Sequence, residues 1–143
     1  ADGLIKVVDP RAYMNSLYSW LGRKDFSRIP ILVTAFGDIF YYRKLTDNEN
    51  DVSLLNIHYR KIEACGSSYQ DFFERYILDQ GVIKKVLRAD LYKQAVKKFG
   101  RLGYQDIFFF TPALVLGGGE DIKYIEKGNG AVHQMVLLAM GNQ

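Results

Sequence analysis

The chain contains few side chains that could ligate a metal. Its soft ligands are two histidines, His58 and His133, and one cysteine, Cys65. A zinc site typically uses closely spaced ligands such as Cys-x-x-Cys or two histidines one helical turn apart, and neither spacing occurs in this sequence. We therefore expect no bound metal, and we interpret each histidine as a surface residue or a hydrogen-bonded core residue. The single cysteine excludes an internal disulfide and is typical of a reducing compartment, so we expect a cytoplasmic protein.

Two segments resemble catalytic motifs but lack the residues that do the chemistry. Gly117-Gly118-Gly119 is followed by an acidic pair, where a phosphate-binding Walker loop has lysine and then serine or threonine. The segment from Gly66 to Gln70 does not fit the Gly-x-Ser-x-Gly pattern of serine hydrolases. Nothing marks an apolar pocket around the nearby acidic residues Glu120, Asp121 and Glu126, so we interpret them as solvated surface groups. The sequence predicts a protein that is not an enzyme and uses no cofactor.

Aromatic and arginine residues crowd the predicted hairpin region. Tyrosine, tryptophan and arginine dominate the energetics of protein–protein interfaces, although alternate residues of a strand can simply pack inward. The candidate partner-binding residues are Tyr41, Tyr42, Arg43, Tyr59 and Arg60. A basic edge is interpreted first as a solvated helix face and second as an electrostatic docking patch. It comprises Lys84, Lys85, Arg88, Lys93, Lys97, Lys98 and Arg101.

Composition favours a single packed domain. The chain has 143 residues, of which 48% are hydrophobic, and a chain of this length buries roughly two-thirds of its unfolded surface. The net charge of +3 is modest for a nucleic-acid-binding protein, and no apolar run approaches the roughly 20 residues of a membrane span. We expect no direct contact with nucleic acid or membrane. The chain starts at Ala1 without an initiator methionine and enters a predicted strand almost at once, so we expect a fragment of a longer protein.

Local signals in the first half predict strands around one helix. Asp9 and Pro10 are favoured as the N-cap and first residue of a helix that ends at Leu21 before Gly22. Gly37-Asp38 fits a two-residue hairpin turn. A strand pair and one long bent strand both remain open for Val52–Ile57 with Arg60–Ala64. The other predicted strands are Leu4–Val8, Ile29–Phe36 and Ile39–Leu45.

The second half is predicted to add helices and a buried strand. Ser68 and Asp71 resemble a capping box that opens a helix ending at Gly81. Ile107–Phe110 is wholly apolar, which predicts a central strand buried on both faces and ended by Pro112. We expect Phe108, Phe110, Leu114 and Leu116 to be almost fully buried. Further predicted elements are a helix over Asp90–Phe99, a short strand over Ile122–Ile125 and a helix over Ala131–Met140. The predicted class is α+β: a mostly antiparallel mixed sheet flanked by helices, in one compact domain.

Several of these segments together resemble a known family. They are Phe99-Gly-Arg-Leu102, the run from Asp106 to Gly118 that contains Pro-Ala-Leu-Val-Leu-Gly-Gly, and Ala131-Val-His133 with Leu137-Leu138-Ala139. This pattern resembles the C-terminal domain of type VI secretion immunity proteins that neutralise DNase effectors. Upstream, Val8-Asp9-Pro10 with Tyr13, and Thr34-Ala35-Phe36-Gly37-Asp38, resemble the end of a GAD-like domain that precedes it.

The resemblance implies a function and a division of the chain. Residues 1–64 would be the end of the GAD-like region and residues 65–143 the immunity domain, within one structural domain. It implies a bacterial immunity protein that binds a cognate DNase-like toxin stoichiometrically, without catalysis. The alternative is a non-catalytic regulatory or structural binding module that has no toxin partner. The motif residues to which it assigns structural roles are Ala35, Phe36, Gly37, Asp38, Phe110, Pro112, Ala113, Leu114, Gly117 and Gly118.

Overall fold

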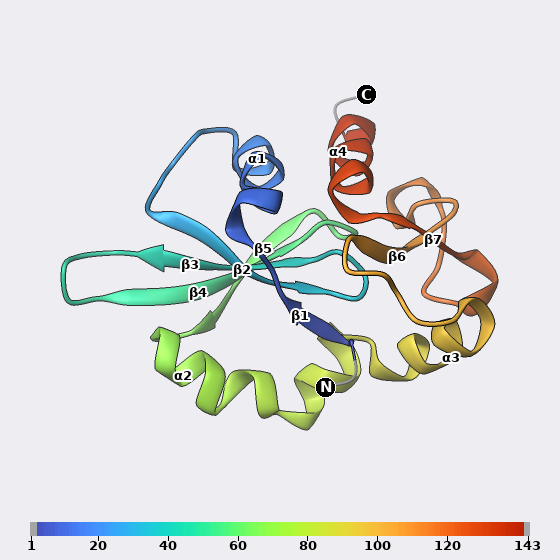
Figure 1. The fold of residues 1–143 in the computed structure, drawn as a ribbon, viewed down its shortest axis with the longest axis horizontal. Helices are drawn as coiled ribbons and strands as arrows, with labels where there is room; N and C mark the ends of the chain where they lie inside the picture. The colour runs from blue at the N-terminus through green and yellow to red at the C-terminus, as the bar shows by residue number, and fades with distance from the viewer. Residues whose placement is uncertain (1–2, 142–143) are drawn as a thin grey trace.

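A five-stranded antiparallel sheet forms the centre of the molecule. The computed structural model describes residues 3–141. The strands lie in chain order, β1-β2-β3-β4-β5, and each pairs with the next. Helices α1 and α4 lie on one side of this sheet and α2 on the other, while α3 and a small second sheet lie at one end (Figure 1). The predicted α+β class is confirmed.

The first half of the chain builds the sheet and α1. Leu55 of β4 lies opposite Ile62 of β5, so the segment whose form was left open is a strand pair. The elements are β1 (Ile5–Val7), α1 (Pro10–Leu21), β2 (Arg28–Thr34), β3 (Ile39–Lys44), β4 (Asn50–Asn56) and β5 (Lys61–Gly66).

The second half adds helices, short turns and a second sheet. Strands β6 and β7 pair antiparallel with each other, apart from the main sheet. The helices are α2 (Tyr69–Glu74), α3 (Ala89–Phe99) and α4 (Gly130–Gly141), and the strands are β6 (Asp106–Phe110) and β7 (Ile125–Asn129). The short helical turns are Tyr76–Leu78, Val82–Val86, Leu114–Leu116 and Ile122–Tyr124. The strand predicted over Ile122–Ile125 therefore begins only at Ile125. Among residues 3–141, no helix combines the length and apolarity that crossing a bilayer requires.

Side chains at the helix ends explain which predicted boundaries hold. The Asp9 carboxylate accepts the Arg11 N–H at the start of α1, and Gly22 ends the helix with a left-handed conformation, as predicted. Ser68 Oγ accepts the Asp71 N–H at 3.0 Å, also as predicted. However, α2 ends at Glu74 rather than near Gly81. The Asp79 carboxylate accepts the Val82 N–H and starts a separate turn there, because an aspartate side chain competes with helical hydrogen bonding.

The hairpin between β2 and β3 differs from its predicted form. Its loop is Ala35-Phe36-Gly37, because the Thr34 N–H donates to the Asp38 carbonyl at 2.9 Å. Gly37 takes a φ of +87°, the left-handed residue that ends a three-residue hairpin loop. The two-residue turn predicted at Gly37-Asp38 is therefore wrong. Asp38 instead ends the loop with a side chain that is fully buried.

Each face of the main sheet packs against its own apolar cluster. On one face, Phe40 and Leu54 cluster with Phe72 of α2. On the other face, a second cluster combines Leu17 of α1 and Leu137 of α4 with the strand residues Ile39, Tyr41 and Leu55. Neighbouring strand residues point to opposite faces, and both faces are covered here. A strand residue such as Tyr41 is consequently in an apolar environment whichever face of the sheet it points to.

Strand β6 joins the two clusters. Its Ile107 belongs to the cluster under α1 and α4, and its Phe108 and Phe110 belong to the cluster under α2. The Phe108 N–H donates to the Ala35 carbonyl at 2.8 Å, which attaches β6 to the β2–β3 hairpin. The strand is thus buried on both faces, but its predicted place as a central strand of the sheet is wrong.

The segment after β6 turns toward solvent. Phe108 and Phe110 are buried as predicted, but Leu114 is half-buried and Leu116 is 59% exposed. These two leucines lie in a short helical turn after Pro112, so the chain does not continue through the core. A Cβ added at Gly118 would lie 1.9 Å from the Pro112 carbonyl oxygen, which makes a glycine necessary at this close approach.

Phenylalanine truncation tests the burial pattern of β6. Phe110 is 2% exposed and its ring is stacked on Phe36, so Phe110→Ala should cost about 3–5 kcal/mol of unfolding free energy. Phe109 is half-buried against His133, so Phe109→Ala should cost less. Urea unfolding of both variants measures the difference. Equal losses at the two positions would contradict the orientation of the strand.

Candidate partner-binding surface

The five candidate residues lie in two separate places. Tyr41, Tyr42 and Arg43 are on β3, and Tyr41 is only 3% exposed within the cluster under α1. Its candidacy as an accessible partner-binding residue is therefore wrong, because α1 and α4 cover the face of β3 on which it lies. Tyr42 is half-buried and contacts Tyr69 edge-to-face at 6.1 Å. Arg43 forms two hydrogen bonds to the Asp51 carboxylate, at 3.0 and 2.6 Å.

Tyr59 and Arg60 lie in the turn between β4 and β5. Tyr59 is 50% exposed, the most open of the five candidates, and its hydroxyl donates to the Glu120 carboxylate. The Asn56 side chain accepts the N–H groups of His58 and Tyr59, which holds the turn in shape. The Arg60 guanidinium lies 4.7 Å from the centre of the Trp20 ring and donates to the Leu137 carbonyl at 2.9 Å. An ordered aromatic and arginine surface results.

A buried ionic network lies beneath Tyr59. The Arg88 side chain is 4% exposed; its Nη1 donates to Asp38 at 3.0 Å and its Nε to Glu120 at 2.5 Å. The other oxygen of Asp38 accepts the Ile57 N–H at 2.9 Å. Glu120 in turn accepts the Tyr59 hydroxyl, and this hydrogen bond raises the pKa of Tyr59. The network therefore connects the exposed tyrosine to the interior of the protein.

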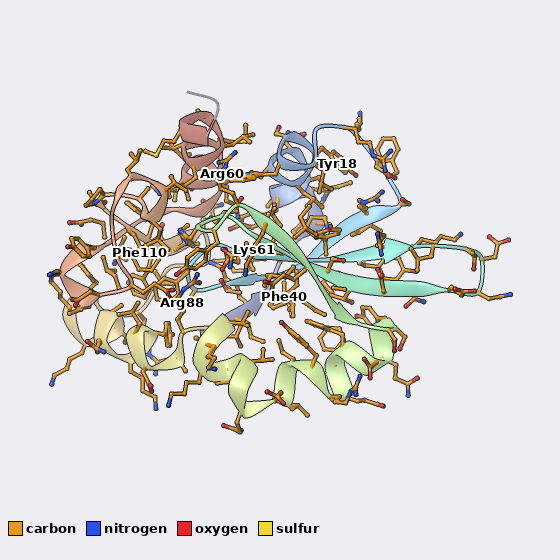
Figure 2. All side chains as sticks on the ribbon, turned by 180° about the vertical axis from the view of Figure 1, so that it is seen from behind. Tyr18, Phe40, Arg60, Lys61, Arg88 and Phe110 are labelled. Carbon is orange, nitrogen blue, oxygen red and sulfur yellow. The ribbon has the colours of Figure 1, made fainter. Side chains whose placement is uncertain are left out.

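Sequence reasoning missed the role of Arg88. It was assigned to the exposed basic edge, but its backbone takes a left-handed conformation just before α3 and directs the side chain inward. There the guanidinium lies 5.3 Å from the centre of the Phe36 ring and 5.8 Å from that of Phe110. Figure 2 shows Arg88 close to Phe110. No local pattern around Arg88 distinguishes it from the neighbouring lysines. Its buried partners are distant in sequence, so no nearby residue could have revealed them.

His58 is a core residue rather than a metal ligand. Its Nε2 lies 2.6 Å from the Phe36 carbonyl oxygen, which can only accept, so Nε2 carries the proton. Burial lowers the pKa of His58 and keeps the ring neutral, although the Asp38 charge acts in the opposite direction. The ring also meets Phe110 edge-on at 5.0 Å. Within residues 3–141, no three His, Cys, Asp or Glu side chains gather as a metal site.

The remaining reactive side chains do not join this network. Cys65 is a buried free thiol, and burial raises its pKa to about 11, so little reactive thiolate forms near neutral pH. His133 stacks on Phe109 with ring centres 3.7 Å apart, and burial lowers its pKa to about 4. Both residues therefore have packing environments rather than catalytic ones.

The two sequence motifs meet in space. The Phe36 ring, in the hairpin loop, is stacked on Phe110 with centres 5.6 Å apart. Ala113 is 4% exposed, and Gly118 packs against the Pro112 carbonyl. Leu114 and Gly117 lie in and after the short helical turn that follows Pro112, with Gly117 at a φ of +98°. The hairpin motif and the proline-glycine motif thus pack against each other, and their Phe36 and Phe110 rings contact the Arg88 guanidinium.

A cavity opens beside this network. It has a volume of about 460 Å³ and lies where Arg88 and Glu120 approach the surface. Its walls carry polar groups from Lys84, Lys85, Asp90 and Gln94. The side chain of Leu91 adds an apolar part. The arrangement offers a recess of mixed charge next to an exposed tyrosine, which is suited to recognising a partner's polar side chains.

The chain is similar to known proteins in sequence and in fold. A family model described as "T6SS immunity protein Tdi1, C-terminal" matches residues 66–141. Among solved structures, the chain is similar to one titled "Crystal structure of Atu4351 from Agrobacterium tumefaciens", with a TM-score of 0.69 and 15% sequence identity. That likeness covers 96% of this chain and 67% of the other, and it shows a shared fold. A comparison with curated proteins finds no match.

Removing Arg88 tests the buried network. Arg88→Met should cost about 3–5 kcal/mol of unfolding free energy, because it leaves the fully buried Asp38 carboxylate unpaired. The double variant Arg88→Met/Asp38→Asn should lose less than the sum of its single variants. Arg75→Met is the matched control, since its ion pair with Asp71 is exposed and should contribute about 0.5 kcal/mol or less. Chemical denaturation measures all four variants, and equal costs for Arg88→Met and Arg75→Met would contradict the network.

Acid should destabilise the fold through its histidines. Burial lowers the pKa of His58, and that of His133 to about 4, whereas an unfolded histidine titrates near pH 6.5. The unfolded chain therefore binds protons that the folded chain does not. The stability contributed by the neutral rings is complete above about pH 6.5 and is lost as the pH falls toward 4.

Unfolding at a series of pH values from about 7 to about 5 should show this decline. His133→Phe preserves a ring that can stack on Phe109 and should reduce the slope. An unchanged slope in that variant would show that His133 is already solvated in the native state.

Proposed function

We propose that this chain, which belongs to the family described as T6SS immunity protein Tdi1, C-terminal, neutralises a cognate toxin by binding it stoichiometrically. It is a type VI secretion immunity protein, and the family match over residues 66–141 is the observation that carries the proposal. The resemblance of the Asp106–Gly118 segment to immunity proteins of DNase effectors supplies the class of toxin. In this proposal the protein acts in the bacterial cytoplasm, where a delivered DNase-like toxin would reach DNA.

The groups around Tyr59 support recognition rather than catalysis. Arg88 stays protonated at any physiological pH, so it cannot serve as a general base. One Glu120 oxygen accepts from Arg88 and the other accepts from Tyr59. A general acid or base must exchange a proton with a substrate, whereas this carboxylate is engaged on both sides. Its role in the proposal is to hold the surface in a fixed shape.

We place the toxin contact at the turn between β4 and β5. Tyr59 combines exposure with a fixed position, since Asn56 orders its backbone and Glu120 its hydroxyl. A side chain that is already ordered loses less conformational entropy on binding. Arg60 and Trp20 extend the same surface with the residue types that dominate interface energetics. Tyr42 and Arg43 remain a second candidate pair. However, Tyr42 already contacts the Tyr69 ring, and Arg43 is already paired with Asp51.

Capture of the product of a neighbouring toxin-like reading frame tests the proposal. The wild-type protein should co-purify with that product in a 1:1 complex. Tyr59→Ala/Arg60→Ala should weaken binding by about 1–4 kcal/mol, because it removes both proposed contact side chains. Tyr42→Ala/Arg43→Ala is the matched comparison, with the same two residue types removed from β3. Calorimetric titration gives the affinities, and thermal melts establish that each variant is folded.

The outcomes separate the function from its location. A larger loss for Tyr42→Ala/Arg43→Ala than for Tyr59→Ala/Arg60→Ala would move the contact to β3. A wild-type protein that captures no such product would defeat the toxin-binding proposal and favour a binding module without a toxin partner.

A further inference from the structure

The outer face of α3 and its flanking segments form a basic surface. On α3, Lys93, Lys97 and Lys98 are exposed, whereas Tyr92 and Ala95 are buried. The basic face is defined by these three lysines together with Lys84 and Lys85 before the helix and Arg101 after it, all exposed. Across residues 3–141, none of these six cations forms an ion pair. The positive charge there is directed at solvent.

The basic face carries more positive charge than the chain has in total. The formal net charge of the whole chain is +3, which is less than the charge of the six cations alone, so the remainder of the protein is net negative. The β3–β4 end of the sheet lies at the opposite end of the molecule from α3 (Figure 1). An acidic partner that approaches would be attracted toward α3 and not equally toward every surface.

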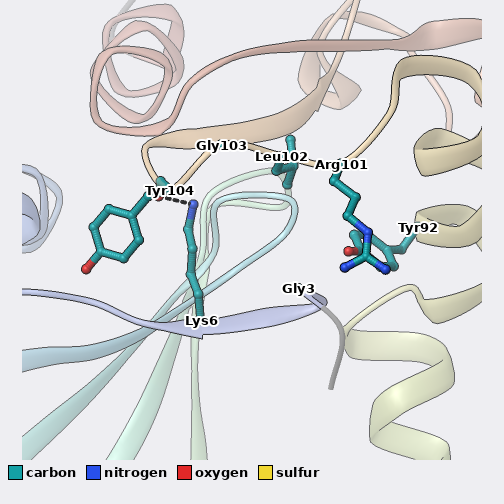
Figure 3. Close-up of a pocket in the computed structure, with 7 residues that line it drawn as sticks. All are labelled: Gly3, Lys6, Tyr92, Arg101, Leu102, Gly103 and Tyr104. Carbon is teal, nitrogen blue, oxygen red and sulfur yellow. Dashed lines mark hydrogen bonds between the residues drawn. The ribbon is translucent and has the colours of Figure 1, made fainter.

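Two cavities with cationic walls flank α3. The first is the recess of about 460 Å³ bounded by Lys84, Lys85 and Arg88. The second, of about 300 Å³, lies between Lys6 of β1 and Arg101 after α3 (Figure 3). Each is large enough for a single carboxylate-bearing side chain. The basic face therefore has recesses at both sides as well as an exposed ridge between them.

The second cavity retains hydrogen-bonding capacity. The Lys6 ammonium donates to the carbonyl oxygens of Tyr104 and Asp106, which uses two of its three N–H groups. Burial lowers the pKa of Lys6, so an incoming carboxylate would compensate a partly desolvated cation. Figure 3 shows the Arg101 side chain across this cavity from Lys6. A carboxylate between Lys6 and Arg101 would meet two cations.

The carboxylates beside the basic face favour a protein partner over nucleic acid. Asp90 and Glu120 lie on the wall of the first cavity, where they would repel a continuous chain of phosphates. Acidic protein side chains are spaced irregularly, so they can meet Lys84 and Lys85 at the first cavity and enter the second cavity without lying against these carboxylates. The net negative charge of the remaining residues also opposes wrapping by DNA.

We propose that the basic face docks an acidic surface of the toxin, outside the site where that toxin binds DNA. This rests on the proposed function, in which the toxin is DNase-like. A DNase attracts the phosphates of its substrate with cations, and those cations would repel the basic face. The immunity protein therefore does not imitate DNA. It approaches through complementary charge, with Tyr59 next to the first cavity because both adjoin Glu120.

Association kinetics with the neighbouring toxin-like product test the docking face. Lys93→Glu/Lys97→Glu reverses charge on α3, and Lys84→Glu/Lys85→Glu does so on a separate element in case the first variant is unstable. Each should slow association by about tenfold or more at low salt, with a smaller change in dissociation. Lys24→Glu/Lys44→Glu is the matched control. It changes the net charge equally but lies in the α1–β2 loop and at the end of β3, away from α3 (Figure 1), and it should leave the rate nearly unchanged. Added salt should slow the wild-type protein more than either α3-side variant.

Each result distinguishes the docking face from the function. Equal association rates for the α3-side and control variants would overturn the face and leave the proposed function standing. A wild-type protein that binds no toxin defeats both. A parallel titration with a short DNA duplex addresses nucleic acid: tight binding that Lys93→Glu/Lys97→Glu abolishes, with toxin association unchanged, would assign the face to DNA and overturn the proposal.

Discussion

The ion pair between Arg88 and Asp38 is the constraint on which the surrounding structure depends. Both side chains are buried, so neither charge can recover its hydration if the other is removed. The pair connects the end of the β2–β3 hairpin to the start of α3, and Glu120 adds the loop before β7. The three segments, distant in sequence, must therefore come together before the buried charges of Arg88 and Asp38 are paired. Phe36 and Phe110 enclose the guanidinium, so the same place joins the charges to the apolar core.

This constraint also relates the family-matched segment to the rest of the chain. The match begins at Gly66, the last residue of β5, and covers α2 to α4. However, Asp38 and Tyr59 lie before it, and both apolar clusters contain residues from either side of Gly66. The region that carries the family identity consequently packs against a sheet made by the preceding residues. A partner surface that includes Tyr59 and α3 would span both parts.

The charge distribution bears on how such a protein can inhibit. An inhibitor that imitates DNA must carry dense negative charge, whereas this chain has a net charge of +3 and concentrates its unpaired cations around α3. Under the proposed function, inhibition from a site away from the DNA-binding surface would require a rigid contact, because its effect must reach the active site through structure. The engaged carboxylates and the ordered β4–β5 turn would provide that rigidity.

The sequence alone determined the features that depend on neighbouring residues. The caps at Asp9 and Ser68, the glycines that end α1 and α3, the α+β class and the lack of metal-ligand spacing all rest on patterns of a few residues. The family resemblance likewise rests on short motifs. Tertiary structure decided burial: helices cover both faces of the sheet and so bury Tyr41 on β3, whereas Tyr59 lies in the β4–β5 turn and stays exposed. It also placed β6 beside the hairpin and turned Arg88 inward. Arg88 meets partners 50 and 32 residues away, and such pairing energy has no local trace because a buried and a solvated cation look the same in sequence.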